Sequence, residues 1–338
     1  MDLSAMPTPQ LVASDLDGTL LNDQERITDR TRAALQAARK AGATVVLATG
    51  RPTRWMRPVL EQLDFHPHVI CANGALVVDT AKETIVASHR LAPQVLATII
   101  DQAKQVLPTA GLSFAVELGG DPGDHWLDGG FLVTAGYRPV WSDDPVKSPP
   151  ITAPIHDDAA VAMIAAGPDY QPDGGMHRST RGVSQAEDSN DTVVLPKVPA
   201  QQYAVVSESV IAGAPAVKLL IRQPALSSQD MFEALSTVIG DDLCELTYSI
   251  HSGLIEISAA GVNKRQGLED VVSALGLDPA ATIAFGDMPN DVAMLTYAGV
   301  GVAMGNACEQ AQAAADLVTG RNSDDGVAQV LEVCFPQG

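Results

Sequence analysis

Short apolar runs recur in the first part of the chain, and each run ends in polar residues or glycine. The runs are residues 11–13, 44–48 and 69–72, and the periodicity between them predicts helices over residues 31–38 and 55–63. Strands that alternate with helices are typical of an α/β fold with a doubly wound parallel sheet. In such sheets, ligands bind at the carboxyl ends of the strands, where the polar residues stand.

The same alternation returns in the last part of the chain. The pattern predicts helices over residues 264–275, 290–295 and 327–333 and strands over residues 282–285 and 300–304. We therefore expect the two ends of the chain to build one sheet domain together.

The pattern changes between these two parts, which indicates an inserted α+β domain of residues 81–260. The expected core domain then comprises residues 1–80 and 261–338. Residues 143–200 are rich in Pro, Gly, Ser and Asp without sustained periodicity, which predicts a long irregular excursion. The elements expected in the insert are strands over residues 86–91, 113–116, 217–221 and 254–257 and a helix over residues 95–106.

The composition excludes several classes of protein. The 338 residues are 46% hydrophobic and carry a net charge of −20, which suits one large domain or two ordinary ones. An acidic protein repels nucleic acid and anionic membranes, so we expect neither as a partner. No apolar run reaches 18 residues, so we expect no membrane span.

The N-terminus and the cysteines bear on the compartment. The first residues lack a basic region followed by an apolar stretch, so we expect no secretory signal. The four cysteines are far apart and form no Cys-x-x-Cys pair, which is typical of reduced, mostly buried thiols. We therefore expect a cytoplasmic protein.

Two aspartates follow the first apolar run. Asp15 and Asp17 are two positions apart, so in a strand they point to the same side, and Gly18 lets the chain turn away. Carboxylates held close together repel each other unless a cation or a proton lies between them. Such a pair suits Mg²⁺, a nucleophile or both.

Hydrolysis of a phosphate ester requires a nucleophile, a cation and a proton donor for the leaving oxygen. Asp15 can attack phosphorus to form an aspartyl-phosphate, and Asp17 can protonate the leaving alcohol and then deprotonate water. The other groups that this chemistry requires stand at further strand and helix ends. They are Thr49 and the N–H of Gly50 for phosphoryl oxygens, Lys264 for positive charge, Asp287 for Mg²⁺, and Asn290 and Asp291 to orient ligands or water.

Each of these motifs has an ordinary interpretation when it is taken alone. An Asp-x-Asp pair is common, Thr49-Gly50-Arg51 can be a strand-to-helix turn, and Lys264 can be a solvated helix residue. A calcium loop is excluded, because that pattern requires glycine at its sixth position and Gly18 is the fourth residue from Asp15. The joint pattern carries the argument, since four strand ends in order bear the groups that the chemistry needs.

This ordered set resembles the haloacid dehalogenase (HAD) superfamily of phosphohydrolases, and more narrowly its Cof-type branch. The resemblance covers roughly residues 10–80 and 215–335. The matching motifs are Asp15-Leu16-Asp17-Gly18-Thr19-Leu20, Ala48-Thr49-Gly50-Arg51, Asn73-Gly74-Ala75, Gly261-Val262-Asn263-Lys264, Gly286-Asp287 with Asn290-Asp291, and Met304-Gly305-Asn306-Ala307. It implies a Rossmann-like core with an inserted α+β cap domain that closes over the site.

The resemblance also implies a role for each matching residue. Asp15 is the expected nucleophile and Asp17 the general acid and base. Mg²⁺ is expected on Asp15, the backbone carbonyl of Asp17, and Asp287, supported by Asp291. The phosphoryl group is expected on Thr49, Gly50 and Lys264, with Asn290 near it.

The resulting hypothesis is a Mg²⁺-dependent phosphomonoesterase that acts on a small phosphorylated metabolite. The resemblance favours a sugar phosphate, and phosphorylated cofactors are also substrates in the branch. The excursion at residues 143–200 is longer than the branch norm, so the relatives leave the substrate open. A phosphosugar mutase and a non-catalytic phosphosugar sensor remain alternatives. In the cap, either substrate contact or an ordinary surface or packing role is open to His125, Trp126, His177, Arg178 and Arg181.

Overall fold

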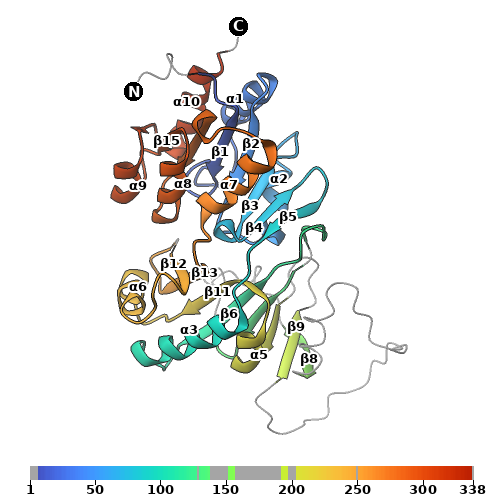
Figure 1. Ribbon diagram of the computed structural model, residues 1–338, viewed down its shortest axis with the longest axis vertical. Helices are drawn as coiled ribbons and strands as arrows, with labels where there is room; N and C mark the ends of the chain where they lie inside the picture. Colours follow the sequence, from blue (N-terminus) through green and yellow to red (C-terminus); the bar gives the residue numbers. More distant parts are fainter. Residues whose placement is uncertain are drawn as a thin grey trace, which may run out of the picture.

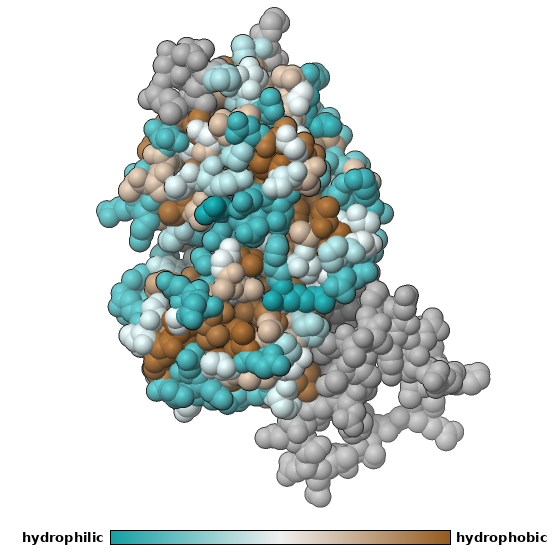
Figure 2. Space-filling view, in the orientation of Figure 1, coloured by the Kyte–Doolittle hydropathy of each residue, from teal (hydrophilic) through white to brown (hydrophobic). Residues whose placement is uncertain are grey.

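The computed structural model describes residues 7–127, 129–137, 151–156, 192–196, 203–248 and 250–336. An eight-stranded sheet with its helices forms the upper half in Figure 1, and a six-stranded sheet with its own helices forms the lower half. We call these the core sheet and the cap sheet. In the space-filling view, an indentation at the left edge separates the two halves (Figure 2). Among the described residues, no helix combines the length and the apolar character needed to cross a bilayer.

The core sheet has the strand order β16-β15-β14-β1-β2-β3-β4-β5. The six strands from β16 to β3 are parallel, and β4 and β5 extend the sheet antiparallel. This confirms the expected α/β fold with a doubly wound sheet. The strands are β1 (Leu11–Asp15), β2 (Thr44–Ala48), β3 (His68–Cys71), β4 (Leu76–Asp79), β5 (Thr84–Ser88), β14 (Thr282–Gly286), β15 (Val300–Ala303) and β16 (Leu317–Val318).

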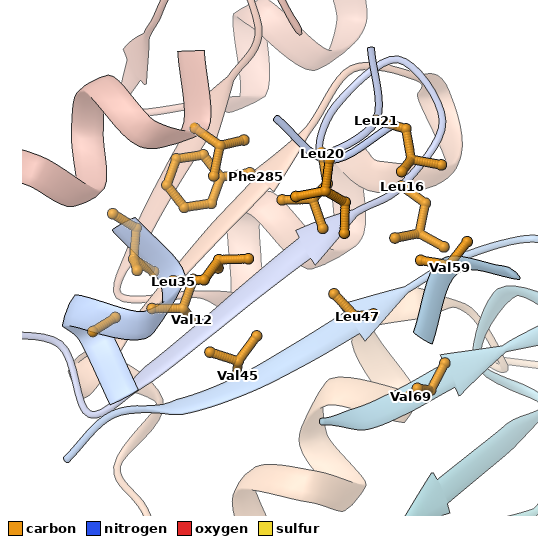
Figure 3. Close-up of a cluster of buried hydrophobic side chains, with 14 of the residues drawn as sticks. Val12, Leu16, Leu20, Leu21, Leu35, Val45, Leu47, Val59, Val69 and Phe285 are labelled. Atoms are coloured by element: carbon orange, nitrogen blue, oxygen red, sulfur yellow. The ribbon is translucent and has the colours of Figure 1, made fainter. Parts of the chain in front are cut away.

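Helices cover both faces of the core sheet because the parallel strands are apolar on both sides. Helix α1 (Asp29–Lys40) and helix α10 (Gly326–Cys334) pack on one face, where Val12, Val45 and Phe285 are buried (Figure 3). The other face is covered by α7 (Lys264–Leu275), α8 (Val292–Tyr297) and α9 (Glu309–Ala314). The short helical turns of this half are η2 (Thr53–Trp55), α2 (Arg57–Leu60), η3 (Ala72–Gly74), η6 (Pro279–Ala281), η7 (Pro289–Asp291) and η8 (Asn322–Asp324).

The cap sheet has the order β10-β7-β6-β11-β13-β12 and is mostly antiparallel. Its apolar face packs against three helices, α3 (Pro93–Val106), α5 (Glu208–Gly213) and α6 (Ser228–Ser236). The chain enters this half after β5 and returns to the core between β13 and α7. The strands are β6 (Ser113–Leu118), β7 (Phe131–Thr134), β10 (Tyr203–Val206), β11 (Ala216–Arg222), β12 (Cys244–Thr247) and β13 (Leu254–Ala259).

Two expectations need correction. Strand β5 lies in the core sheet, although the boundary expected at residue 80 assigned it to the insert. The helix expected over residues 55–63 is instead the pair of short turns η2 and α2. Pro58 explains the break, because it has no N–H to donate to the carbonyl of Arg54 four residues earlier.

Most of the excursion expected at residues 143–200 lies outside the described residues. Within it, the structure describes the backbone of two antiparallel strands, β8 (Ile151–His156) and β9 (Thr192–Pro196), which form a separate two-stranded sheet. The cap candidates His177, Arg178 and Arg181 also lie outside the described residues.

Candidate active site

The turn after β1 approaches the carboxylate of Asp287 closely. The backbone of Gly18 has a φ of 79°, and a Cβ atom built on it would lie 2.4 Å from Oδ2 of Asp287. No side chain fits in that space, so glycine is required both for the turn and for the approach. The hydroxyl of Thr19 donates to Oδ1 of the same carboxylate at 3.0 Å. The turn therefore contacts Asp287 through both of its oxygens.

A buried lysine lies between two buried aspartates. Asn263 caps α7 by accepting from two backbone N–H groups, so the helix begins at Lys264. The ammonium nitrogen of Lys264 is 2.5 Å from Oδ1 of Asp15 and 2.6 Å from Oδ1 of Asp291. Burial lowers the pKa of Lys264, but the two carboxylates outweigh it and hold that pKa above its ordinary value. The ammonium group is therefore charged at neutral pH.

Asp291 also fixes the backbone that carries Asp287. Its Oδ2 accepts from the N–H of Asp287 at 3.0 Å and from the N–H of Met288 at 2.9 Å. These bonds close the turn that follows β14. As a result, Asp15, Asp287 and Asp291 bring carboxylate oxygens within 4.8 Å of one another.

This carboxylate cluster has the properties of a divalent-cation site. Three buried carboxylates face a single ammonium group, so negative charge is in excess. Burial, and after it the neighbouring carboxylates, raise the pKa of Asp15 well above its ordinary value and that of Asp287 to about 7, against the opposing charge of Lys264. A bound cation would offset the excess negative charge and lower both pKa values. The all-oxygen donor set fits Mg²⁺, which prefers hard carboxylate ligands.

Thr49 and Gly50 follow β2 at the same edge of the sheet. Asp15 pairs with Ala48 in the β1–β2 register, so Thr49 lies just beyond the end of β1. Thr49 is buried, and its hydroxyl accepts from the N–H of Arg51 at 3.0 Å. The two residues thus stand at the strand end where the sequence predicts the phosphate-binding groups.

Asn290 reaches the same edge from η7. Its Nδ2 donates to Oδ1 of Asn73 at 3.1 Å. Its own Oδ1 is buried and has no hydrogen-bond partner among the described residues. A buried amide oxygen without a partner is a costly arrangement, which a water, an ion or a hydrogen-bond donor of a ligand would relieve.

Asp17 stands apart from the carboxylate cluster. Its side chain is 53% exposed and forms a bidentate ion pair with Arg51, in which Nε lies 2.8 Å from Oδ2. The pair holds the exposed Asp17 carboxylate outside the buried cluster. The expected metal contact through its backbone carbonyl stays a prediction.

The sequence motifs indicate no role for four polar residues that meet at this edge. They are Arg51 and Asn73 of the core and Lys218 and Glu256 of the cap. One signal was available for the last two, since a charged residue inside an otherwise apolar strand needs a buried partner. Two described cap candidates lie elsewhere: His125 is exposed, and Trp126 is buried beside the β5 hairpin.

A family model described as haloacid dehalogenase-like hydrolase matches residues 12–117 and 182–331. Curated proteins match over almost the whole chain. A putative phosphatase from Bacillus subtilis, YxeH, is 25% identical over 95% of this chain and 97% of its own length. The pyridoxal phosphate phosphatase YbhA of Escherichia coli is 26% identical over 96% of this chain and 98% of its own length.

The name of a third curated relative contains another phosphorylated compound. The 5-amino-6-(5-phospho-D-ribitylamino)uracil phosphatase YitU of Bacillus subtilis is 26% identical over 97% of this chain and 98% of its own length. Among solved structures, the subclass IIB sugar phosphatase BT4131 has a TM-score of 0.63 at 19% identity, covering 96% of this chain and 98% of that chain. BT1666 from Bacteroides thetaiotaomicron has a TM-score of 0.63 at 21% identity, covering 97% and 95%. These structural likenesses concern the fold.

Proposed function

The chain belongs to the haloacid dehalogenase-like hydrolases of the Cof type and is a phosphatase of that superfamily; from this premise we propose that it is a Mg²⁺-dependent phosphomonoesterase that works through an aspartyl-phosphate. The single observation that supports this most is the convergence of Asp15, Lys264, Asp287 and Asp291 at one edge of the core sheet. Phosphoryl transfer needs a nucleophile, cationic charge and a metal site in one place.

Asp15 is the proposed nucleophile. Its carboxylate attacks phosphorus, the bond to the leaving oxygen breaks, and the phosphoryl group is held as an acyl phosphate on Asp15. Lys264 neutralises charge beside Asp15, and Thr49, Gly50 and Asn290 are proposed to contact the phosphoryl oxygens. In the second step, water attacks phosphorus and releases inorganic phosphate.

Mg²⁺ is proposed to be held by Asp15, the backbone carbonyl of Asp17, and Asp287, with Asp291 in support. It would supply charge neutralisation at the phosphoryl oxygens. The buried carboxylate cluster supports this assignment, because its excess negative charge and all-oxygen donors suit that ion.

Asp17 is the proposed general acid and base. It protonates the leaving alcohol in the first step and removes a proton from water in the second. Its exposed position outside the buried cluster supports this role, since a proton shuttle must reach the leaving group.

A small phosphorylated metabolite is the proposed substrate, with a sugar phosphate favoured. The curated relatives carry the names of phosphatases for pyridoxal phosphate and for a phosphoribityl compound, so both compounds belong in a substrate screen.

We also propose the cytoplasm as the compartment, which the four free thiols support. By sheet membership of β5 and the packing of α7 on the core sheet, we propose a core of residues 7–88 and 264–336 with the cap between them.

Hydrolysis of para-nitrophenyl phosphate with and without Mg²⁺ tests this proposal. We expect Mg²⁺-dependent release of phosphate that Asp15→Asn abolishes while the fold is retained. Asp79→Asn is a matched control, because Asp79 is also a buried aspartate at the end of a core strand but lies outside the carboxylate cluster. Substantial activity in Asp15→Asn would refute the assignment of Asp15 as the nucleophile. Phosphate appearing on an added sugar instead of in water would favour a mutase.

A further inference from the structure

Charged side chains interrupt the apolar strands of the cap sheet. Lys218 on β11 pairs in register with Glu117 on β6, and Glu256 stands on the neighbouring strand β13. All three residues are buried, with exposures of 3%, 4% and 4% in that order. Burying charge is costly unless it is paired and hydrogen-bonded, so each of these groups needs a specific partner.

Lys218 and Glu256 find their partners in each other and in the core. The ammonium nitrogen of Lys218 is 2.5 Å from Oε2 of Glu256 and 2.7 Å from the carbonyl oxygen of Gly50. Oε2 of Glu256 also accepts from Nδ2 of Asn73 at 2.9 Å. Two cap residues therefore hold two core residues that follow β2 and β3.

The contact with Asn73 continues to the proposed phosphate site. A carboxylate can only accept hydrogen bonds, so Glu256 fixes the Asn73 amide with its nitrogen toward the cap. The amide oxygen of Asn73 then faces Asn290 and accepts from its Nδ2 at 3.1 Å. The orientation of the Asn290 side chain thus depends on a glutamate that belongs to the cap sheet.

We propose that Lys218 and Glu256 are positioning residues that set the phosphate-binding groups of the core from the cap. Glu256 acts on Asn290 through Asn73, and Lys218 acts on the turn at Gly50 through the carbonyl oxygen of that residue. The inference rests on the proposed function, because it takes Gly50 and Asn290 as phosphate-binding groups. Phosphate affinity then depends on these two cap residues, neither of which lies in the carboxylate cluster.

The competing explanation is that Lys218 and Glu256 act only as a clasp, that is, as contacts that hold the cap to the core. The structure offers a control for this explanation. Arg54 of η2 forms a bidentate ion pair with Glu117 across the same interface, with Nη2 2.8 Å from Oε1. The guanidinium also lies over the rings of Trp55 and Phe131. These contacts involve none of the proposed phosphate-binding residues, so this pair can be removed without breaking the path to Asn290.

Calorimetric binding of inorganic phosphate in the presence of Mg²⁺ tests the proposal on the full chain. Two double variants remove the same charges, namely Lys218→Met with Glu256→Leu and Lys218→Met with Glu256→Gln. We expect the leucine double variant to bind phosphate about 10-fold more weakly. The glutamine double variant keeps an acceptor for Asn73 but also lacks the Lys218 contact with Gly50, so it should recover part of that affinity and stay weaker than the wild type. The clasp control, Arg54→Met with Glu117→Leu, should stay close to the wild type.

Equal affinities in the two double variants, or an equal loss in the clasp control, would overturn the positioning role. Should the double variants fail to fold, Asn73→Gly breaks the path alone, because glycine readily adopts the left-handed backbone of Asn73 (φ 57°). We expect that variant to lose phosphate affinity as well, and unchanged affinity would reject the inference. A wild-type protein that binds no phosphate would instead refute the proposed function.

Discussion

The ammonium nitrogen of Lys264 lies 2.5 Å from Oδ1 of Asp15, although 249 positions separate the two residues. This contact joins the end of β1 to the start of α7, one from each end of the chain. Both partners are buried and are paired with each other, so the contact is part of the fold as well as of the site. A change at either residue should therefore affect both stability and chemistry.

Lys264→Met should lower activity and stability together. It leaves Asp15 and Asp291 without their shared cation, and removing one partner of a buried ion pair costs about 3–5 kcal/mol. Loss of one stabilising charge at a reacting centre typically lowers kcat by about 100-fold or more. Thermal melts and hydrolysis rates check both effects. Arg30→Met is the control, because its pair with Glu332 is exposed and should matter little to either measurement. A variant with wild-type activity would contradict the role of Lys264.

Stabilisation by Mg²⁺ should increase as pH rises through neutrality. Burial raises the pKa of Asp287 from 3.8 to about 7, so the metal-free folded protein binds a proton there that the unfolded chain releases. The contribution of Asp287 to the stability of the metal-free protein is therefore fully present below the unfolded pKa of 3.8 and is lost as pH rises through about 7. A cation competes with this proton. Melting temperatures in Mg²⁺ and in chelator should diverge more at about pH 8 than at about pH 6. A difference that shrinks with rising pH would contradict this linkage.

Gly18→Ala should weaken Mg²⁺ binding more than its effect on folding explains. The new Cβ would lie 2.4 Å from Oδ2 of Asp287, and the left-handed backbone adds strain of about 1–2 kcal/mol. Gly42→Ala is a matched control, because Gly42 also has a positive φ, of 96°, but a Cβ added there would meet no atom within 4 Å. Both variants should lose stability, and only Gly18→Ala should need more Mg²⁺ for half-maximal activity. Equal Mg²⁺ requirements would show that the turn does not constrain Asp287.

The sequence predicts which side chains of the core converge, because parallel strands end at a shared edge. Asp15, Thr49 and Asp287 each follow an apolar run, and a doubly wound sheet brings such positions together whatever their separation in sequence. These features depend on periodicity and on neighbours in sequence.

The contacts between cap and core could not be predicted in this way. Lys218 meets Gly50, and Glu256 meets Asn73, only because the cap sheet packs against one edge of the core. No periodicity encodes that packing. The sheet to which β5 belongs could not be predicted either, because its apolar pattern would be the same in the core sheet and in the cap sheet. Pairing between distant segments decides such cases.

Arg51→Met should slow substrates with poor leaving groups more than substrates with good ones. Arg51 holds the carboxylate of Asp17 in a bidentate pair, so its loss frees the proposed proton donor from a fixed position. Protonation matters most when the leaving oxygen is strongly basic, as in an alkyl phosphate, and least for para-nitrophenolate. The ratio of kcat/KM for these two substrates should therefore change in Arg51→Met and, more strongly, in Asp17→Asn. Arg57→Met, at an exposed arginine of α2, should leave that ratio as in the wild type. Equal losses on both substrates in Asp17→Asn would show that Asp17 does not transfer the proton.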